Sequence, residues 1–316
     1  MRNQLITVFG GTGFIGRHLV RRLAGQRARV LVISRNPARG HFLQPMGGVG
    51  QILVERADLA SEQALARTLA GSSAVVNLMG ILYETRQQKF DQVHGVLPGR
   101  IAHVAAAAGI RRMVHISAIG ADPGSTSAYA RSKADGERRV QDALPAATIL
   151  RPSIVIGPED GFFNRFAAMA RLLPALPLIG GGETRFQPVY VGDVADAILA
   201  ALRMSAAAGQ TYQLGGPQVY SFAELMRYML DVIGRRRLLL PLSFGMASFK
   251  ARFLELLPVP PLTRDQVELL KVDNVVADGA KGLSDLGIAA TPIELIVPQY
   301  LARYRASPAP HRAQPQ

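Results

Sequence analysis

A glycine-rich turn near the start of the chain constrains the fold more than any other stretch. Residues 5–9 are apolar and mostly β-branched, residues 10–16 are Gly-Gly-Thr-Gly-Phe-Ile-Gly, and residues 17–24 are amphipathic. This order predicts a buried strand, a tight turn and a helix. Such a turn lets a pyrophosphate approach the backbone, where free N–H groups and the positive end of the helix dipole attract it. The pattern therefore predicts a dinucleotide phosphate site.

Apolar strands and amphipathic helices alternate beyond this turn. We expect further strands at residues 29–33, 51–55, 74–80, 112–116 and 147–152, and helices at 61–69, 90–108 and 134–144. Strands separated by helices at this spacing pair in parallel through right-handed crossovers. The sequence therefore predicts an α/β fold, a Rossmann-type doubly wound parallel sheet with a smaller C-terminal α+β portion.

The alternation becomes less regular after residue 152. The expected elements are a helix at 162–172, a Pro- and Gly-rich loop at 173–182, a helix at 193–204, a short strand at 211–214 and a helix from Ser221 to residue 233. We predict a dinucleotide-binding core at residues 1–152. Residues 153–307 are expected to form a mixed substrate or partner portion with some strands returning to the core. A disordered tail, rich in Pro, Ala and Gln, is predicted at 308–316.

The composition excludes several kinds of protein. The 316 residues include no cysteine, which rules out disulfides, thiolate zinc sites and cysteine nucleophiles, and we predict no metal site. Residues 1–4 lead directly into the first strand, so we expect no signal peptide. No apolar run approaches the ~20 residues of a membrane-spanning helix. These features favour a cytoplasmic location.

The chain is strongly basic. A formal net charge of +13 suggests a polyanionic partner, or an arginine-rich proteome with an anionic cofactor. The lack of Trp, and of basic stretches interleaved with aromatic residues, argues against nucleic acid. Residues 235–257 join three arginines to apolar, partly helical sequence. This stretch is typical of an element on an anionic membrane surface, although a core-packed helix beside a solvated charge run fits it too.

The tip of the second strand bears on the choice of nicotinamide cofactor. NAD-binding folds usually place Asp or Glu there, whereas this chain has Ser34, Arg35 and Asn36. Arg17 also lies just past the last glycine of the turn. A guanidinium binds a 2′-phosphate through paired charge-assisted hydrogen bonds, and a carboxylate would repel it. We therefore predict NADP(H), with NAD(H) less favoured.

Other predicted cofactor contacts follow the ends of neighbouring strands. Asp58 is expected near the adenine, where either it or Ser61 caps the helix at 61–69. Gly80 ends the fourth strand, where the backbone passes close to the ribose and nicotinamide. The complete predicted set is Gly10, Thr12, Gly13, Phe14, Ile15, Gly16, Arg17, Ser34, Arg35, Asn36, Asp58, Leu59, Leu78, Gly80, Ser117, Tyr129, Lys133 and Pro152.

Ser117, Tyr129 and Lys133 form a candidate catalytic group. Ser117 ends the predicted strand at 112–116, and Tyr129 and Lys133 have the spacing that places two side chains on one helix face. To act near neutral pH, a phenol with a pKa of about 10 needs a drop of roughly three units. An adjacent ammonium and an oxidised nicotinamide favour the phenolate, and a serine can donate to the reacting oxygen. A helix edge that carries these residues without chemistry is the alternative.

These motifs resemble a known family. The glycine turn, Ser117 and the Tyr129–Lys133 pair are similar to an extended or atypical short-chain dehydrogenase/reductase. Ser117 and Tyr129 are closer in sequence than in typical sugar-nucleotide epimerases, which argues against an epimerase. Residues 151–166, 187–195 and 212–217 resemble one branch, the NADPH-binding accessory subunit of respiratory complex I and its bacterial relatives.

The resemblance implies a tightly held NADPH that stabilises the protein rather than turning over. It also implies complex I subunits as partners, with the C-terminal part docked near the membrane, peripheral on the inner face of the cytoplasmic membrane. The alternative is an active NADPH-dependent reductase of a lipid-like or quinone-like carbonyl, since Ser117, Tyr129 and Lys133 are all present. Tyr129 would be the acid/base, Lys133 its electrostatic support and Ser117 the residue that orients the carbonyl. A redox-sensing regulator that binds NADP(H) is a more remote third reading.

Overall fold

A parallel sheet of seven strands forms the core of the protein, in the order β11–β6–β5–β4–β1–β2–β3. The computed structural model describes residues 1–305, and the tail predicted for 308–316 lies outside them. The strands are β1 (Leu5–Phe9), β2 (Arg29–Ile33), β3 (Ile52–Glu55), β4 (Ser72–Asn77), β5 (Met113–Ile116), β6 (Thr148–Pro152) and β11 (Thr211–Leu214). The strand order reverses between β1 and β4, as in a Rossmann-type sheet. The predicted fold class is confirmed.

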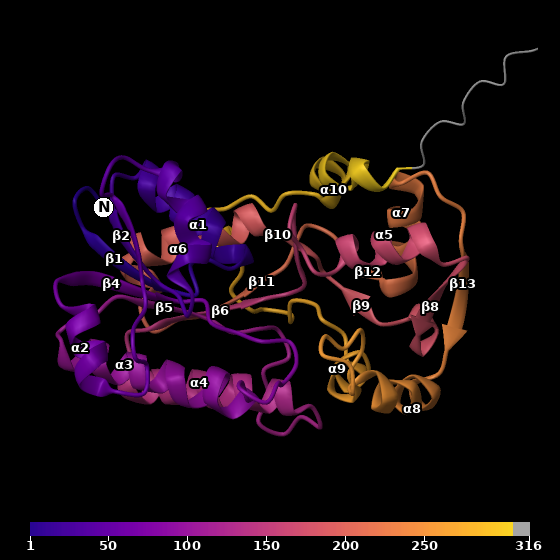
Figure 1. The fold of residues 1–316 in the computed structure, drawn as a ribbon, viewed down its shortest axis with the longest axis horizontal. Helices are drawn as coiled ribbons and strands as arrows, with labels where there is room; N and C mark the ends of the chain where they lie inside the picture. The colour runs from indigo at the N-terminus through magenta and orange to yellow at the C-terminus, as the bar shows by residue number, and fades with distance from the viewer. Residues whose placement is uncertain (306–316) are drawn as a thin grey trace, which may run out of the picture.

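Helices cover both faces of this sheet (Figure 1). They are α1 (Phe14–Gly25), α2 (Glu62–Leu69), α3 (Leu97–Ala107), α4 (Ala128–Ala143) and α6 (Val191–Arg203). Ile6 and Val8 of β1 belong to the core shared with α1 and α6, whereas Phe9 belongs to the core shared with α2, α3 and α4. Successive side chains of a strand point to opposite faces, so the buried, mostly apolar β1 contributes to both cores.

The helix predicted at residues 90–108 is interrupted. A π-helical turn, η2 (Asp91–Val96), precedes α3. Pro98 has no N–H to bond the carbonyl of His94 four residues earlier, and its ring would clash with that carbonyl in a regular helix. The His94 carbonyl instead lies against Gly136 of α4, where a Cβ would overlap it. The wide turn therefore brings His94 onto the helix that carries Tyr129 and Lys133.

A second, smaller body follows the sheet, on the right of Figure 1. Its elements are β7 (Val155–Ile156), α5 (Phe163–Leu172), β8 (Ala175–Ile179), β9 (Arg185–Phe186), β10 (Val189–Tyr190), β12 (Tyr220–Ser221), α7 (Phe222–Val232), β13 (Leu238–Leu242), α8 (Phe244–Leu254), α9 (Arg264–Leu269) and α10 (Ile293–Leu301). Short 3₁₀ turns occur at Pro37–Met46, Gly180–Gly182, Ser205–Ala207, Ser284–Leu286 and Ala302–Tyr304. Phe163, Phe186 and Phe222 lie in its separate apolar core.

The two five-residue strands of the second body, β8 and β13, were not predicted from the sequence. The loop predicted at 173–182 contains β8, which pairs in parallel with β13 from the stretch predicted as apolar and partly helical. Pro177 and Pro241 stand within these strands, and a proline argues against a strand because it cannot donate to the ladder. Each of the two strands has one partner, so the proline nitrogens can face the open edge. The loop prediction was wrong, and the helix within 235–257 is confined to α8.

Candidate nucleotide-binding site

The glycine turn lies at the carboxyl end of β1, beside the point where the strand order reverses. Gly10 has a φ of +78°, and Gly13 is the N-cap of α1. A Cβ at Gly10 would lie 3.2 Å from the carbonyl carbon of Leu78, and one at Gly16 would lie 2.5 Å from the Cα of Gly11. Glycine is therefore required both for the turn and for its contact with α1. The open N–H groups at the start of α1 suit a pyrophosphate.

Two arginines lie at the adenosine end expected from the sequence. Arg35 is exposed at the tip of β2, next to Ser34, whose Oγ lies 3.4 Å from Thr12 Oγ1. Arg17 is held differently, because its Nη1 pairs with Glu159 at 3.2 Å and its guanidinium lies 5.0 Å from the centroid of the Phe42 ring. Glu159 offsets part of the Arg17 charge. Arg35 is therefore the more available cation for a phosphate.

The structure distinguishes the two caps considered for α2. Ser61 is the N-cap and accepts from Ala64 N at 3.2 Å. Asp58 Oδ1 accepts from Ala60 N at 2.9 Å and so stabilises the bend before the helix. Leu59 uses its carbonyl oxygen to accept from Arg100 Nη1 at 2.8 Å. Asp58 remains exposed at the carboxyl end of β3.

Other predicted contacts border the turn or the next strands. Phe14 of α1 lies against Gly157, where a Cβ would be 3.2 Å from the ring. Ile15 is partly buried and packs against the core shared with α6. Asn36 N donates to Ser34 Oγ at 3.3 Å. The Pro152 carbonyl, at the end of β6, accepts from Ile119 N at 3.0 Å.

Ser117, Lys133 and Gly80 meet at the carboxyl ends of β4 and β5. Lys133 Nζ donates to the carbonyl oxygen of Ile116 at 3.2 Å, directly before Ser117. A Cβ at Gly80 would lie 3.5 Å from the same Nζ. The Ser117 side chain is buried, and its Oγ has no hydrogen-bond partner within residues 1–305. A buried hydroxyl without a partner is costly, so this point suits a polar group of a ligand such as a nicotinamide nucleotide.

Tyr129 lies in the first turn of α4, and its ring centroid is 5.9 Å from Lys133 Nζ. The helix begins at Ala128 rather than at residue 134, because Ser127 Oγ caps it by accepting from Ala130 N at 3.2 Å. Burial and the Asp265 carboxylate raise the pKa of Tyr129 to about 12. The expected lowering of this pKa is therefore not produced by the protein's own groups. Burial lowers the pKa of Lys133 to about 8.

His94 was not singled out from the sequence. Its Nε2 accepts from Ile81 N at 3.0 Å, so its Nδ1, which is 3.0 Å from Ser132 Oγ, carries the proton. Ser132 Oγ in turn donates to the Tyr129 carbonyl at 2.8 Å. Burial and the charge of Lys133 lower the pKa of His94 to about 2. This neutral histidine therefore links the segment after Gly80 to α4.

His115 is a second buried histidine that the sequence did not reveal. Its Nδ1 lies 3.0 Å from Asn77 Nδ2, and its Nε2 has no partner in the described part of the chain. Burial and Lys133 lower its pKa to about 3. Both histidines lie between β4–β5 and α4. One sequence signal could have drawn attention to His94. Pro98, four residues later, cannot donate a hydrogen bond to the His94 carbonyl, so the helix is expected to be irregular there.

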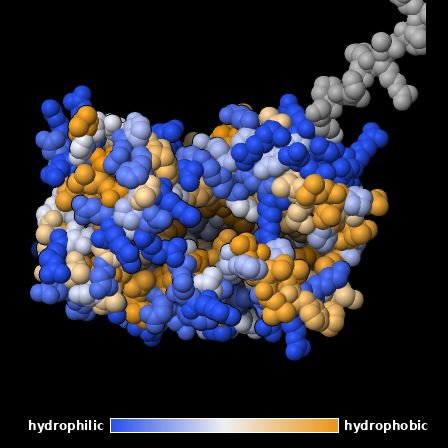
Figure 2. Space-filling model, viewed as in Figure 1, coloured by the Kyte–Doolittle hydropathy of each residue, from blue (hydrophilic) through white to orange (hydrophobic). Residues whose placement is uncertain are grey.

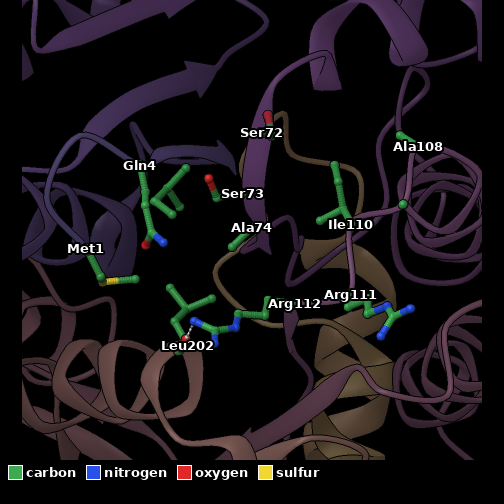
Figure 3. Close-up of a pocket in the computed structure, with 12 residues that line it drawn as sticks. Met1, Gln4, Ser72, Ser73, Ala74, Ala108, Ile110, Arg111, Arg112 and Leu202 are labelled. Atoms are coloured by element: carbon green, nitrogen blue, oxygen red, sulfur yellow. Dashed lines mark hydrogen bonds between the residues drawn. The ribbon is translucent and has the colours of Figure 1, made fainter.

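A cavity of about 330 Å³ lies at the amino ends of β1, β4 and β5, opposite the glycine turn (Figure 3). Gln4, Ser73, Arg111 and Arg112 are among the residues that line it, and none of the predicted site residues is. Arg112 points to Leu202 and donates to its carbonyl at 3.2 Å, near the end of α6. This cation therefore serves a helix terminus. Within residues 1–305, no three His, Asp or Glu side chains are grouped to hold a metal ion.

Comparison with known proteins establishes the family. The model of the family described as "NAD dependent epimerase/dehydratase family" matches residues 6–215 of this chain. The chain belongs to this family. It is an extended short-chain dehydrogenase/reductase, and the family binds NAD(P). A solved structure of this type, MoeE5 in complex with UDP-glucose and NAD, is similar with a TM-score of 0.69 and 20% identity, over 94% of this chain and 96% of that one. This likeness shows the fold.

Curated relatives identify the branch of this dehydrogenase/reductase family. The chain is 38% identical over 311 residues to "NADH dehydrogenase [ubiquinone] 1 alpha subcomplex subunit 9, mitochondrial" of Arabidopsis thaliana, which covers 95% of this chain and 77% of that protein. It is 35% identical to the subunit of the same name from Mus musculus, and the match covers 95% of this chain and 80% of that protein. A ceramide reductase of Caulobacter vibrioides is 31% identical, and the match covers 73% of this chain and 71% of that protein. The resemblance to the complex I subunits is confirmed.

Proposed function

We propose that this protein is an NADP(H)-binding accessory or assembly component of a complex I-type respiratory enzyme, and that it holds NADPH as a structural cofactor. The observation that carries this proposal is the 38% identity to the Arabidopsis subunit over 95% of the chain. The tight turn at Gly10 and Gly16 and the buried Ser117 hydroxyl, which has no hydrogen-bond partner within residues 1–305, support nucleotide binding. Residues 1–152 would hold the nucleotide, and residues 153–307 would supply the partner surface.

The preference for NADP(H) over NAD(H) rests on charge at the tip of β2. Ser34 stands where an acidic residue would accept from a ribose 2′-hydroxyl, and Arg35 beside it is exposed. A guanidinium there favours a 2′-phosphate. Arg17 contributes less because Glu159 pairs with it at 3.2 Å.

The state of Tyr129 argues against turnover in the direction of alcohol oxidation. Burial and Asp265 raise the pKa of its phenol to about 12, so it stays protonated at neutral pH. Oxidation of an alcohol needs a base at this position, which a protonated phenol does not provide. A cofactor bound beside it would be held rather than cycled in that direction.

The surface of α8 supports a peripheral position on an anionic membrane at the inner face of the cytoplasmic membrane. Phe249 is 61% exposed, Phe253 58% and Leu256 82%, and apolar side chains gather over α8 and β13 at the lower right of Figure 2. Lys250 and Arg252 are exposed on the same helix. Apolar and basic groups together suit the interface of an anionic bilayer. No helix within residues 1–305 has both the length and the apolar character to cross one.

Turnover assays test the structural role. The purified protein, loaded with NADPH, is mixed with a panel of quinones and lipid-like carbonyl compounds while absorbance at the nicotinamide band is followed. We expect NADPH to stay bound and unoxidised with every compound. Oxidation that disappears in Tyr129→Phe would overturn the structural role and establish an enzyme.

The second candidate function is an NADPH-dependent oxidoreductase of a lipid- or quinone-like carbonyl. The proximity of Ser117, Lys133 and Tyr129 and the 31% identity to the Caulobacter ceramide reductase favour it. Ser117 would orient the carbonyl oxygen, Tyr129 would donate its proton, and Lys133 would stabilise the resulting negative charge. NADPH, when bound, supplies the hydride.

A further inference from the structure

The helix that carries Tyr129 and Lys133 is capped from the C-terminal body of the protein. The Asp265 carboxylate, on α9, accepts from Ala128 N at 2.6 Å, from Tyr129 N at 3.2 Å and from Ser127 Oγ at 2.9 Å. The first N–H groups of a helix have no partner within it, and a carboxylate there also interacts favourably with the helix dipole. Ser127 is the local cap, and Asp265 satisfies the donors that Ser127 leaves open.

Two further hydrogen bonds attach α9 to the borders of the nucleotide site. Glu268 Oε2 accepts from Thr126 Oγ1 at 3.2 Å, before the start of α4. Gln266 Nε2 donates to the Leu82 carbonyl at 3.3 Å, in the segment that follows Gly80. The α9 helix thus spans the segment after β4 and the N-terminus of α4. These are two of the segments that flank Ser117 and Lys133.

The opposite side of α9 packs on α8, and Figure 1 shows the two helices together near one end of α4. Ala247 and Ala251 of α8 share a small apolar cluster with Val267 of α9. Arg264 N donates to Glu255 Oε1 at 2.6 Å, which fastens the end of α8 to the start of α9. We call α8 and α9 together, residues 244–269, the α8–α9 unit. One side of this unit contacts the site, and its other side carries the exposed apolar surface of α8.

We propose that Asp265 is a positioning residue for Tyr129 and Lys133, through which the α8–α9 unit and the nucleotide site stabilise each other. This inference rests on the proposed nucleotide binding. If the Asp265 hydrogen bonds hold α4 in the arrangement that binds nucleotide, bound nucleotide strengthens the docking of α9 by the same free energy. A surface that engages α8 is then linked to nucleotide retention without touching the nucleotide.

The rate of NADPH release tests this link. We expect release from Asp265→Ala to be about fivefold faster than from the wild type, the change typical of losing one helix cap. Asp265→Asn keeps the side-chain shape and is expected to change in the same direction. The matched control is Asp278→Asn, which alters an exposed carboxylate outside the α8–α9 unit, and its release rate should stay close to wild type. Release is followed by fluorescence after chase with excess NADP⁺.

The ionisation of Tyr129 gives a second readout that needs no nucleotide. With ¹³C-labelled tyrosine, and with the Tyr129 signal assigned by its loss in Tyr129→Phe, both Asp265 variants should lower the Tyr129 pKa from about 12, because the Asp265 charge contributes to raising it. Asp278→Asn should leave this pKa in place.

The possible outcomes separate the inference from the proposed function. If the wild type binds NADPH and both Asp265 variants release it at the wild-type rate, the inference is overturned and the proposed function stands. If the wild type takes up no nucleotide, the proposed function fails, and an unchanged Tyr129 pKa in both variants then overturns the positioning role as well.

Discussion

Gly10, Gly16 and Arg35 belong to the proposed nucleotide site, and each depends on its immediate surroundings. Gly10 has a positive φ, Gly16 lies in close contact with Gly11, and Arg35 is the second residue after the end of β2. The turn and its close contacts follow from chain neighbours, so the sequence could predict them, whereas the nucleotide contact of Arg35 stays a prediction. The roles of His94 and Asp265 depend on partners distant in sequence, Ser132 and Tyr129, and no local pattern reveals them.

Reversal of the charge at Arg35 tests the cofactor preference. We expect Arg35→Asp to weaken NADPH binding by about tenfold or more while NADH binding changes little, because a charge-assisted hydrogen bond to the 2′-phosphate is lost and a repulsion is added. Isothermal titration with both nucleotides measures this. Arg2→Asp, near the amino end of β1, is the control. Equal weakening for NADPH and NADH would show that Arg35 does not contact the phosphate.

Addition of one methyl group at Gly16 tests the close contact in the turn. A Cβ there would lie 2.5 Å from Gly11, so Gly16→Ala should destabilise the protein by about 1–3 kcal/mol and weaken nucleotide uptake. Gly25→Ala lies in the same helix with nothing within 4 Å and should be neutral or slightly stabilising. Urea unfolding of both variants gives the comparison. A Gly16→Ala protein as stable as Gly25→Ala would contradict the packing described.

At the scale of elements, the helix and strand order of the core followed from periodicity, whereas two local features did not. Pro98 converts part of a continuous helix into η2, since it frees a carbonyl that only the distant Gly136 can accommodate. The pairing of β8 with β13 joins segments more than fifty residues apart, and both contain proline. A proline within a short apolar segment argues against a strand when the segment is considered by itself. The two segments are recognised as strands only when their pairing is seen in the structure.

The histidines between β4–β5 and α4 predict how stability depends on pH. His94 and His115 have pKa values of about 2 and about 3 in the folded protein, below the usual histidine value of 6.5. The unfolded chain therefore binds more protons below pH 6.5, and stability falls as the pH falls. At pH 5 each histidine should cost about 2 kcal/mol relative to pH 7.

Urea unfolding between pH 7 and pH 5 measures this dependence. Replacement of His115 by Gln should remove about half of the histidine-dependent loss of stability over that range. The matched control replaces the exposed His103 of α3 by Gln. A His115→Gln protein that loses stability on acidification as steeply as the wild type would contradict the buried neutral state assigned to His115.

At the scale of the whole molecule, several contacts join the two bodies, and three of them differ in kind. β11 returns to the core sheet, Glu159 pairs with Arg17, and Asp265 caps α4. The sequence predicted a core and a C-terminal portion with returning strands. It did not predict the caps and ion pairs between them, because these depend on tertiary contacts. The apolar surface on α8 was expected from residues 235–257, although β13 takes up part of that stretch.

The charge on this surface gives a test of membrane binding. We expect the protein to bind vesicles that contain anionic lipid, and the triple variant Arg236/Lys250/Arg252→Gln to bind at least about tenfold more weakly, since each exposed cation near such a surface contributes about 1 kcal/mol. Arg2/Arg21/Arg29→Gln removes the same charge elsewhere and is the control. Vesicle sedimentation should show that the fraction of protein bound to the vesicles falls as the salt concentration rises, because salt screens the exposed charges. Binding insensitive to salt and equal in both triple variants would exclude an electrostatic role for this surface.

The nucleotide content of the purified protein tests the central claim most directly. The protein is isolated without added cofactor, denatured, and the released nucleotides are separated and identified by chromatography and mass spectrometry, with Gly16→Ala treated in parallel. The account predicts NADPH in an amount that matches the wild-type protein, with little NADH and a clear loss in Gly16→Ala. A wild-type protein that neither carries nor takes up any nicotinamide nucleotide would contradict it.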